Sequence, residues 1–496
     1  MSELNDQELV RREKLQKLIA LGVDPFGSKF DVQHFSVDCK ALATNYDHDG
    51  LQAAGFKVKV AGRIVLLRNM GKASFFTLQD KKGTIQAYIR KDVVGDDAYA
   101  IFDLADLGDI VGVEGTLMLT KTGEITIKVE TYTHLVKALK PLPEKYHGLA
   151  DVEERYRRRY VDLIVNEEAR RVAMLRPRII RGIQKYMDER GFMEFETSML
   201  QSTLGGAAAR PFVTHHNALD RDYYLRIATE LPLKRLLVGG LERVYEIGRL
   251  FRNEGIDTRH NPEFTTIEAY QAYGDINDMK ALAEGLLSSL AQDLLGTYDV
   301  PWGEKVISLK PPFRSVHMVD LVKETSGVDF WKPMAFAEAK KLADEHGIHL
   351  EKHENSVGYV INKFFEHYGE KTLIQPTFVT GHPLEISPLA KKSKDERFTE
   401  RFELFIDGSE YANAFTELNN PLDQEERFLA QLEAKKQGDK EASENDIDFL
   451  EALQYGMPPA GGIGIGIDRL VMLLTNQQSI REVILFPTMK ESPKIK

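Results

Sequence analysis

The residues best suited to chemistry lie in the segment 243–270. Arg252 carries a guanidinium that can hold an anion, and Phe264 offers an aromatic face to a flat ring. Between them, a polar stretch contains Glu254, Arg259 and His260. Alternating side chains on both flanks predict a hairpin with a polar loop. Such a hairpin can hold ATP without a P-loop; the alternative is a surface hairpin with an Arg–Glu salt bridge.

A second segment, 461–469, alternates glycine with isoleucine and then enters a helical pattern. Alternation by two places Ile463, Ile465 and Ile467 on one strand face and the glycines on the other. Glycine weakens a strand interior, so a bare glycine face indicates the close approach of a flat ligand. Arg469 follows where strand meets helix, a suitable place for a second phosphate-binding guanidinium. A dinucleotide-binding loop is disfavoured because these glycines lie within the strand.

Together, FRNEG and RHNPEF within 251–264 and GIGIGIDR at 462–469 resemble the second and third signature motifs of class II aminoacyl-tRNA synthetases. The segment 178–200 supplies the first motif, an amphipathic helix leading into a strand, and the resemblance implies a homodimer through this region. Ser198 stands where the family usually has proline, which puts the local dimer geometry in question. Within the class, the sequence is similar to bacterial lysyl-tRNA synthetases along nearly its whole length.

Composition limits the other classes of protein. With 496 residues the chain should form more than one domain, and its single cysteine, Cys39, excludes an internal disulfide or a cysteine-ligated zinc site. The charged N-terminus lacks the apolar core of a signal peptide and no long apolar run follows, so we expect a cytoplasmic protein without a membrane segment. A net charge of -11 argues against a protein that coats nucleic acid, so any nucleic acid must meet a local patch.

Such a patch lies between residues 57 and 91, where nine Lys or Arg residues accompany one acid, Asp80. Short alternating segments with glycine turns predict a small barrel there, and aromatic residues among basic ones suit stacked single-stranded bases. The resemblance implies an OB-fold anticodon-binding domain. We expect Phe75 to be the stacking platform, with Arg63 and Gln86 contacting bases or backbone. The alternatives are that Phe75, rather than Phe76, faces the barrel core and that Arg63 is simply solvated.

The predicted fold class is α+β: an N-terminal OB-fold β-barrel, then a class II catalytic domain built on an antiparallel sheet flanked by helices. The predicted domains are a helical extension at 1–54, with a helix from Leu4 to about Leu21, the barrel at 55–140, a linker at 141–160 and the catalytic domain at 161–496. A helix-rich insertion is expected at about 313–375. The arginines of RYRRRYVDLI, Arg155 to Arg159, are expected on a solvated hinge helix; a contact with the tRNA backbone is the less favoured interpretation.

Selection of a cationic amino acid requires buried carboxylates. Glu230 precedes the second motif, Glu268 and Tyr270 close its second strand, and GSEYANAFTELN presents Asn413, Phe415 and Glu417 on one strand face. By the resemblance, Glu417 and Tyr270 receive the ammonium of the lysine side chain, Glu230 and the backbone of Gly206 its α-amino group, and Arg252 with Asn413 its carboxylate. Glu417 could instead be an exposed carboxylate at a strand edge.

ATP also requires a metal. Glu403 and Glu410 are seven residues apart, so a turn near Asp407-Gly408 must bring them together. The resemblance implies that they hold Mg²⁺, with more than one ion per active site, although salt bridges are the alternative. It also implies that Phe264 stacks on adenine, Glu254 accepts from the adenine amino group, and Arg252, Arg469 and His260 act on the phosphates. His260 could instead be only a turn residue.

The implied reaction has two steps: lysine attacks the α-phosphate of ATP with release of pyrophosphate, and the lysyl group then passes to the 3′ end of tRNA. Three alternatives stay open. An aspartyl or asparaginyl synthetase shares the motifs, but its pocket should present cations where this chain has Glu417 and Glu268. A synthetase paralogue that modifies another acceptor usually lacks the barrel. A module that only binds tRNA would not require Arg252, Arg469 and the paired glutamates together.

Overall fold

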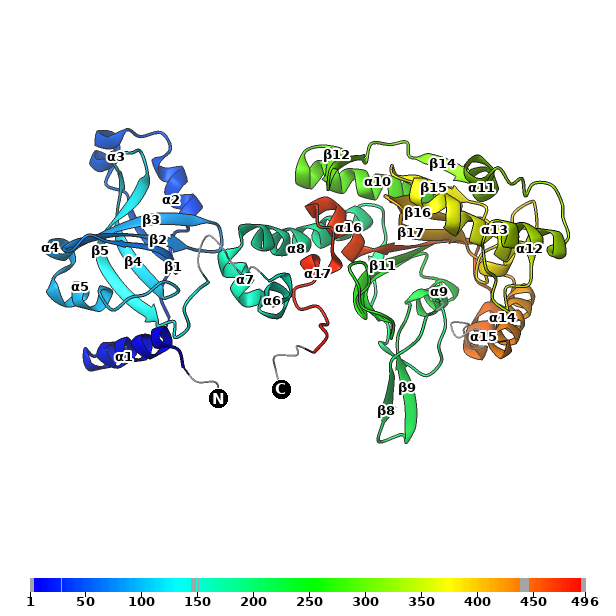
Figure 1. Cartoon of the computed structure of the whole chain (residues 1–496), viewed down its shortest axis with the longest axis horizontal. Helices are drawn as coiled ribbons and strands as arrows, with labels where there is room; N and C mark the ends of the chain where they lie inside the picture. The colour runs from blue at the N-terminus through cyan, green and yellow to red at the C-terminus, as the bar shows by residue number, and fades with distance from the viewer. Residues whose placement is uncertain are drawn as a thin grey trace. The chain divides into compact units, whose positions relative to one another are not determined.

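The computed structural model describes residues 4–27, 29–143, 149, 151–207, 209–437 and 446–491. The chain forms two compact units, Met1–Leu149 and Ala150–Lys496. The first unit contains a closed five-stranded barrel and the second an eight-stranded, mostly antiparallel sheet with helices, which confirms the predicted α+β class (Figure 1). Residues 144–148 and 150 of the predicted linker lie outside the described part of the chain.

The first unit consists of three helices followed by the barrel, whose strand order is β1-β2-β3-β5-β4. The elements are α1 (Asp6–Ala20), α2 (Ser36–Ala43), α3 (His48–Ala54), β1 (Lys57–Asn69), β2 (Ala73–Gln79), β3 (Thr84–Arg90), α4 (Lys91–Val94), α5 (Asp96–Phe102), β4 (Ile110–Leu119) and β5 (Ile125–Val136). Every second residue of β2 and β3 is buried, as alternation requires of a strand with one face on a core. Helix α1 begins at a capping box formed by Asn5 and Glu8.

In the second unit, the main sheet has the order β14-β15-β16-β17-β18-β11-β10-β6. Its strands are β14 (Arg314–His317), β15 (Thr377–Thr380), β16 (Arg401–Ile406), β17 (Ser409–Thr416), β18 (Ala460–Gly466), β11 (Glu263–Ala272), β10 (Arg243–Phe251) and β6 (Met193–Glu194). The pairs β14/β15 and β10/β6 are parallel, and the others are antiparallel. Strands β11 and β17 carry several of the residues predicted to bind substrate, and β18 between them carries the glycine face.

Helices α8 (Glu167–Asp188), α10 (Ile276–Leu295) and α16 (Ile467–Thr475) bury the sheet on one side (Figure 1). Ile463 and Ile465 of β18 join Ile179 of α8 and Leu286 of α10 in this core. Ile463 and Ile465 of β18 therefore pack against helices, as predicted, and leave the glycine positions for the opposite side of the sheet. The prediction that Ile467 continues this strand face is wrong, because β18 ends at Gly466 and Ile467 begins α16.

The remaining elements of the second unit lie around this framework. They are α6 (Val152–Arg157), α7 (Arg159–Val165), β7 (Leu200–Gln201), β8 (Val213–His216), β9 (Arg221–Leu225), α9 (Glu230–Val238), β12 (Asp299–Trp302), β13 (Lys305–Ser308), α11 (Met318–Ser326), α12 (Phe336–Glu345), α13 (Val357–Phe364), the π-helix η1 (Phe365–Gly369), the 3₁₀ helices η2 (Glu370–Thr372) and η3 (Leu384–Ile386), α14 (Pro421–Lys436), α15 (Ile447–Gln454) and α17 (Ile480–Val483). Helices α11 to α13 occupy the segment where a helix-rich insertion was predicted, and they share a hydrophobic core with Val379 of β15 and Phe405 of β16.

The first-motif helix starts earlier than the segment 178–200 suggested. Helix α8 begins at Glu167, after Asn166, whose side chain accepts from the backbone N–H groups of Glu168 and Ala169 at 3.1 and 3.3 Å. Pro177 lies inside the helix. A capping asparagine satisfies the free N–H groups of the first turn, so the cap sets the start of this helix.

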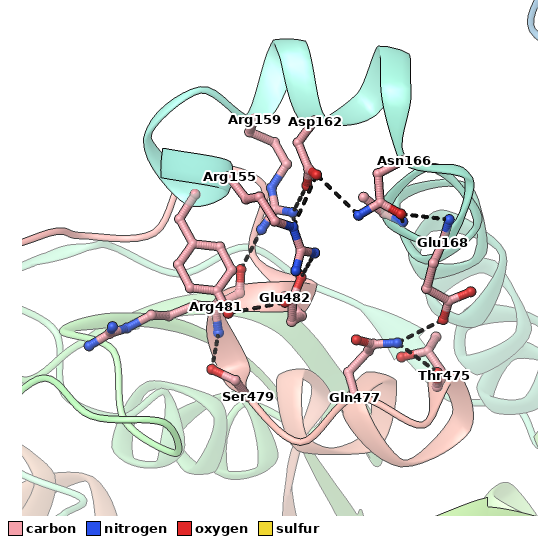
Figure 2. Close-up of polar contacts among 12 residues, drawn as sticks. Arg155, Arg159, Asp162, Asn166, Glu168, Thr475, Gln477, Ser479, Arg481 and Glu482 are labelled. Atoms are coloured by element: carbon pink, nitrogen blue, oxygen red, sulfur yellow. Dashed lines mark hydrogen bonds and ion pairs between the residues drawn. The ribbon is translucent and has the colours of Figure 1, made fainter. Parts of the chain in front are cut away.

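The expectation of a solvated hinge helix is wrong for Arg159, which is only 1% exposed. Its guanidinium lies 2.7 Å from Asp162 and 2.6 Å from the carbonyl oxygen of Arg481, as Figure 2 shows. Arg155 bridges Asp162 and Glu482 at 3.1 and 3.0 Å. These contacts tie α6 and α7 to α17, so the arginine run has a structural role in addition to any exposed one.

Candidate active site

A cavity of about 370 Å³ opens over the glycine face of the central strands. Its walls come from β11, β17, β18, the start of α9 and the loop between β10 and β11. Of the residues predicted to bind ATP, metal or amino acid, all but Glu417 line it: Gly206, Glu230, Arg252, Glu254, His260, Phe264, Glu268, Tyr270, Glu403, Glu410, Asn413, Phe415 and Arg469. The structure therefore gathers in one place side chains that are widely separated in sequence.

At one end of the cavity lie the residues of the second motif. Strands β10 and β11 pair in antiparallel register, with Leu250 opposite Phe264. Arg252 follows the last residue of β10, and its backbone N–H donates to Pro262 O at 2.9 Å, which extends the ladder by one step. Its guanidinium lies 5.1 Å from the centre of the Phe264 ring, and its Nε is buried without a hydrogen-bond partner in the described structure. An unpaired buried guanidinium N–H is costly, so this group is poised for an anionic ligand.

His260 is held by its own loop. Its Nδ1 lies 2.8 Å from Asp257 Oδ2, and the ring is about half exposed. The backbone N–H groups of Arg259 and His260 also donate to Asp257 Oδ1, at 2.6 and 2.8 Å. Burial raises the pKa of Asp257, but the hydrogen bonds from His260 and from these backbone groups outweigh it, so the pKa is lowered. Asp257 was not among the predicted residues, although an aspartate in a loop commonly accepts from the backbone N–H two residues on, as it does here from Arg259.

The two predicted metal ligands meet across the hairpin of β16 and β17. Asp407 and Gly408 form its turn in left-handed conformations, with φ of 49° and 64°. A bulge between Leu404 and Phe405 shifts the register, so that Glu403 lies opposite Asn413 and Phe405 opposite Glu410. The bulge thereby allows two carboxylates at an odd spacing to share one cavity.

The pKa values of Glu403 and Glu410 are shifted in opposite directions. Burial raises the pKa of Glu403, but His382 at 3.4 Å and Arg401 at 2.6 Å outweigh it and lower that pKa to about 2. The pKa of Glu410 is raised by burial and by the negative charge of Glu403, against the pull of nearby arginines. Each carboxylate disfavours the negative charge of the other, and a divalent cation between them would relieve this repulsion. Carboxylate oxygens are also the hard ligands that such a cation prefers. In the described residues no group of three or more His, Cys, Asp or Glu side chains could hold a metal ion.

Arg401 is a site residue that the motifs did not reveal. Its Nε donates to Asn413 Oδ1 at 3.0 Å and one terminal nitrogen donates to Glu403 at 2.6 Å. It thus fixes the side-chain orientation of two predicted ligand-binding residues. Its position two residues before Glu403 on the same strand face was the available signal.

The opposite end of the cavity is acidic and aromatic. Glu268 accepts from the backbone N–H of Thr229 and from the Tyr270 hydroxyl, both at 3.1 Å. Burial, followed by the charge of Glu230, raises the pKa of Glu268 to about 7. Gly206 has a positive φ of 86° and packs directly against Glu230, whose Cβ would lie 3.2 Å from a side chain at that position. Only glycine can make this approach without strain.

Glu417 lies just behind the cavity wall, fully buried. Its Oε2 forms an ion pair with Lys234 of α9, a residue that sequence reasoning missed. Its Oε1 has no hydrogen-bond partner among the described residues and faces Gly462, where a side chain would collide with it. The alternative of an exposed edge carboxylate is therefore wrong. Burial, together with Glu230 and Glu268, raises the pKa of Glu417 to about 8 in spite of Lys234.

A buried ion pair joins the three motif segments beneath the site. Asp468 of α16 accepts from Arg176 of α8 at 2.5 Å and from the backbone N–H of Thr265 in β11 at 2.6 Å. A second buried pair joins Arg226, which follows β9, to Glu246 of β10 at 2.5 Å. Such pairs are costly to break, so they set the relative positions of the strands and helices that carry the site.

In the barrel, the three residues predicted to contact an anticodon differ in their burial and in their contacts. Phe75 points away from the core and stacks on Tyr88, with ring centres 4.5 Å apart, whereas Phe76 is buried. Arg63 is half-buried and donates to Gly108 O at 2.6 Å, and burial lowers its pKa. Gln86 Oε1 accepts from Thr126 at 2.9 Å. Phe75 and Tyr88 thus present an outward aromatic pair, while Arg63 is not simply solvated.

Comparison with known families agrees with this arrangement. The model of the class II tRNA synthetases (D, K and N) matches residues 151–490, more than half of the chain. The chain belongs to this family. An OB-fold nucleic acid binding domain matches residues 58–135, which span the barrel strands.

The similar proteins align with this chain over at least 98% of its length. A protein of Lysinibacillus sphaericus (strain C3-41) named lysine–tRNA ligase is 57% identical over 495 residues, which is 100% of this chain and 99% of that protein. Lysine–tRNA ligases of Enterococcus faecalis (strain V583) and Bacillus cytotoxicus are 56% and 55% identical, each over at least 98% of both chains. The family resemblance stated from the motifs is thereby confirmed.

Proposed function

We propose that this chain is a lysine–tRNA ligase: it activates L-lysine with ATP to lysyl-adenylate and pyrophosphate, then transfers lysine to the 3′ end of its tRNA. The observation that carries the proposal is the acidic end of the cavity, where Glu230, Glu268 and Glu417 gather within a largely buried shell. An unpartnered carboxylate oxygen, Glu417 Oε1, faces the cavity wall. A buried carboxylate needs a cationic partner, which the ammonium of lysine supplies.

The amino-acid substrate would lie between the two ends of the cavity. Its side-chain ammonium would meet Glu417 and Tyr270 beside Phe415, while Glu268 holds Tyr270. Its α-amino group would meet Glu230 and the backbone of Gly206. Its carboxylate would meet Arg252 and Asn413, which Arg401 orients. An aspartate or asparagine side chain would face carboxylates instead, so the charge of this end disfavours that activity.

ATP would occupy the other end. Phe264 would stack on adenine and Glu254 would accept from its amino group, while Arg252, Arg469 and His260 would face the phosphates. Arg469 is held by a hydrogen bond to the carbonyl oxygen of Glu410, so its guanidinium stays beside the predicted metal ligands. Glu403 and Glu410 would hold Mg²⁺, which would supply positive charge next to the phosphates.

The first reaction step then needs no general base from the protein. The carboxylate of lysine is already ionised at neutral pH, so Arg252 contributes by holding it and the α-phosphate together. Fixed guanidinium groups of Arg252 and Arg469 stabilise the charge that develops on the phosphates as the bond to pyrophosphate breaks.

For tRNA we propose the barrel as the anticodon-binding domain. The outward pair of Phe75 and Tyr88 supports a stacking role for Phe75. Gln86 of β3 and Arg63 of β1 lie further along the neighbouring strands, opposite Thr77 and Gln79 of β2. The domain scheme of extension, barrel, linker and catalytic domain is proposed with the boundaries given above.

We further propose a cytoplasmic homodimer joined through the first-motif region. Large apolar side chains are exposed there: Met193, Met199 and Leu200, with Met174 earlier on α8. Clustered exposed apolar residues are typical of an interface. In the described residues no helix is long and apolar enough to cross a membrane.

The decisive experiment is ATP–pyrophosphate exchange with lysine, aspartate and asparagine tested separately, on the wild-type protein and on Glu417→Gln. We expect exchange with lysine alone, and a fall in kcat/KM for lysine of at least about tenfold in the variant, because a charge-assisted hydrogen bond contributes ~1.5–3 kcal/mol. Glu426→Gln, an exposed glutamate on α14, is the matched control. Exchange driven by aspartate or asparagine would contradict the pocket assignment, and no exchange would favour a paralogue or a binding module.

A further inference from the structure

Lys234 is a fully buried lysine whose ammonium lies among the carboxylates of the acidic end. Its side chain is 0% exposed, its Nζ lies 2.5 Å from Glu230 Oε1, and it also forms an ion pair with Glu417 Oε2. The rings of Phe415, Tyr270 and Phe449 surround it at 5.2, 5.9 and 6.0 Å. Aromatic faces and carboxylates therefore replace water around this cation.

The ammonium of Lys234 contacts two carboxylates at once. Glu230 lies one turn earlier on α9, while Glu417 follows the end of β17. The aliphatic stem of Lys234 runs from the helix toward the gap between them, and it does not line the cavity. A single side chain therefore links the two acids that the proposed function assigns to the two amino groups of the substrate.

Lys234 neutralises one of the negative charges at this end of the cavity. Glu230, Glu268 and Glu417 supply three negative charges when ionised, and Lys234 supplies one positive charge, which leaves two uncompensated. Free lysine brings two ammonium groups, and its carboxylate would lie against Arg252 at the other end. The pocket with Lys234 is thus matched to a ligand with two ammonium groups.

We propose that Lys234 is a positioning residue for lysine recognition, which anchors Glu230 and Glu417 and stabilises the ionised form of Glu417 so that Oε1 is free for the substrate ammonium. This inference rests on the proposed function. Glu417 is held from one side only: Oε2 meets Lys234, whereas Oε1 has no hydrogen-bond partner in the described structure. Gly462, which lines the cavity, leaves the space beside Oε1 free of a side chain.

Electrostatics of the neighbouring groups support this role. Burial lowers the pKa of Lys234, but the attraction of Glu230 and Glu417 outweighs it and raises that pKa, so the ammonium stays charged at neutral pH. The groups that face Glu417 are Lys234 and Glu230 of α9 and Glu268 of β11. Of these, only Lys234 favours its ionised form, so the pKa of Glu417, already about 8, would rise further without it.

The test uses the full-length protein with Lys234→Met, which removes the ammonium, and Lys234→Gln, which keeps a hydrogen-bond donor without charge. In ATP–pyrophosphate exchange we expect KM for lysine to rise at least about tenfold, because each unit of pKa change alters the ionised fraction tenfold. The rise of kcat/KM for lysine with pH should move to higher pH by about one unit or more, whereas KM for ATP should stay within about twofold.

Proton release gives a second readout, which a merely structural role would not alter. Lysine binding is measured by calorimetry at about pH 8 in two buffers of different ionisation enthalpy. Because the pKa of Glu417 is raised by burial and by Glu230, part of the wild-type protein carries a protonated Glu417 before lysine binds. We expect the neutral variants to release more protons on binding lysine, because their Glu417 is more fully protonated beforehand.

Lys280→Met is the matched control, because Lys280 on α10 is a partly buried lysine 5.9 Å from the ring of Phe378, but its ammonium donates to Ser315 rather than to the carboxylates of the acidic end. It should leave KM, the pH profile and proton release unchanged. A folded Lys234→Met or Lys234→Gln with the wild-type pH profile and proton release would overturn the inference, as would an equal loss in all kinetic parameters without a pH shift. Failure of the wild-type protein to exchange with lysine would instead overturn the proposed function.

Discussion

Replacing Asp468 by asparagine tests how the three motifs are held together. Asp468 is 2% exposed and receives hydrogen bonds from Arg176 of α8 at 2.5 Å and from the backbone of Thr265 in β11 at 2.6 Å. The substitution keeps the shape of the side chain and removes its charge. Arg176 would then be a largely buried cation without a carboxylate partner.

The expected cost follows from this geometry. Removing one member of a buried ion pair costs ~3–5 kcal/mol. Here the cost is reduced to ~2–3 kcal/mol, since the amide oxygen can still accept one bond and a hydrogen bond to a neutral group retains part of the stabilisation. Arg176 also keeps its bonds to Val483 O and Thr265 Oγ1. With an unfolding entropy of ~2.1 cal/mol/K per residue over the second unit, Tm should fall by ~3–4 °C.

Activity should change selectively, because Thr265 adjoins Phe264 in β11. We expect KM for ATP to rise more than KM for lysine in pyrophosphate exchange. Thermal unfolding followed by circular dichroism at one scan rate gives Tm. The control is Asp446→Asn: asparagine caps α15 as well as aspartate does, and the partner of Asp446, Arg235, is about a third exposed, so its loss costs ~1 kcal/mol or less.

Two results would refute this reasoning. A Tm for Asp468→Asn within about 1 °C of the wild-type value would show that the pair does not stabilise the unit as its burial requires. An equal fall in Tm for Asp446→Asn would show that the loss does not depend on how deeply the arginine partner is buried.

Three further predictions concern other parts of the chain. Phe75→Ala should lower kcat/KM for tRNA aminoacylation about 5- to 150-fold, since stacking contributes ~1–3 kcal/mol per base; pyrophosphate exchange should not change, and Tyr46→Ala, an exposed aromatic of the same unit, is the control. Glu410→Gln should raise the Mg²⁺ concentration for half-maximal exchange several-fold with KM for lysine unchanged; an unaltered Mg²⁺ requirement would argue against a metal ligand. Arg159→Met should destabilise the protein by ~3–5 kcal/mol, because it breaks a buried ion pair with Asp162. The control is Arg158→Met, which removes an exposed arginine and should not lower the Tm. Equal Tm values for the two variants would contradict the contacts in Figure 2.

Local sequence patterns predicted much of the fold and many residues of the site. The alternation around 243–270 predicted the β10/β11 hairpin, and the glycine and isoleucine alternation predicted a strand with one packed face. These predictions succeeded because strand periodicity depends only on neighbouring residues. The start of α8 and the burial of Arg159 were not foreseen, since a cap and a distant partner decided them.

Several contacts in the site could not be predicted from the sequence, because they too join residues that are distant along the chain. Arg401 joins Asn413 and Glu403, His382 lies against Glu403, and the β16/β17 bulge sets which residues face the cavity. No periodicity indicates which charged side chains meet once they are buried. The roles assigned to individual residues in binding ATP, lysine, metal and tRNA stay predictions, although the structure gathers nearly all of the proposed catalytic ones around one cavity.

The sequence by itself determined the chemistry that is available: arginines and aromatics on a hairpin, a glycine-lined strand, and acids on the adjoining strand, because residue type and short-range periodicity are local properties. Only the tertiary structure decided how the charges are paired. Glu417 lies behind the wall with Lys234 rather than at a strand edge, and Asp468 joins α8 to β11. Burial makes every such charge depend on a partner that packing alone brings within reach.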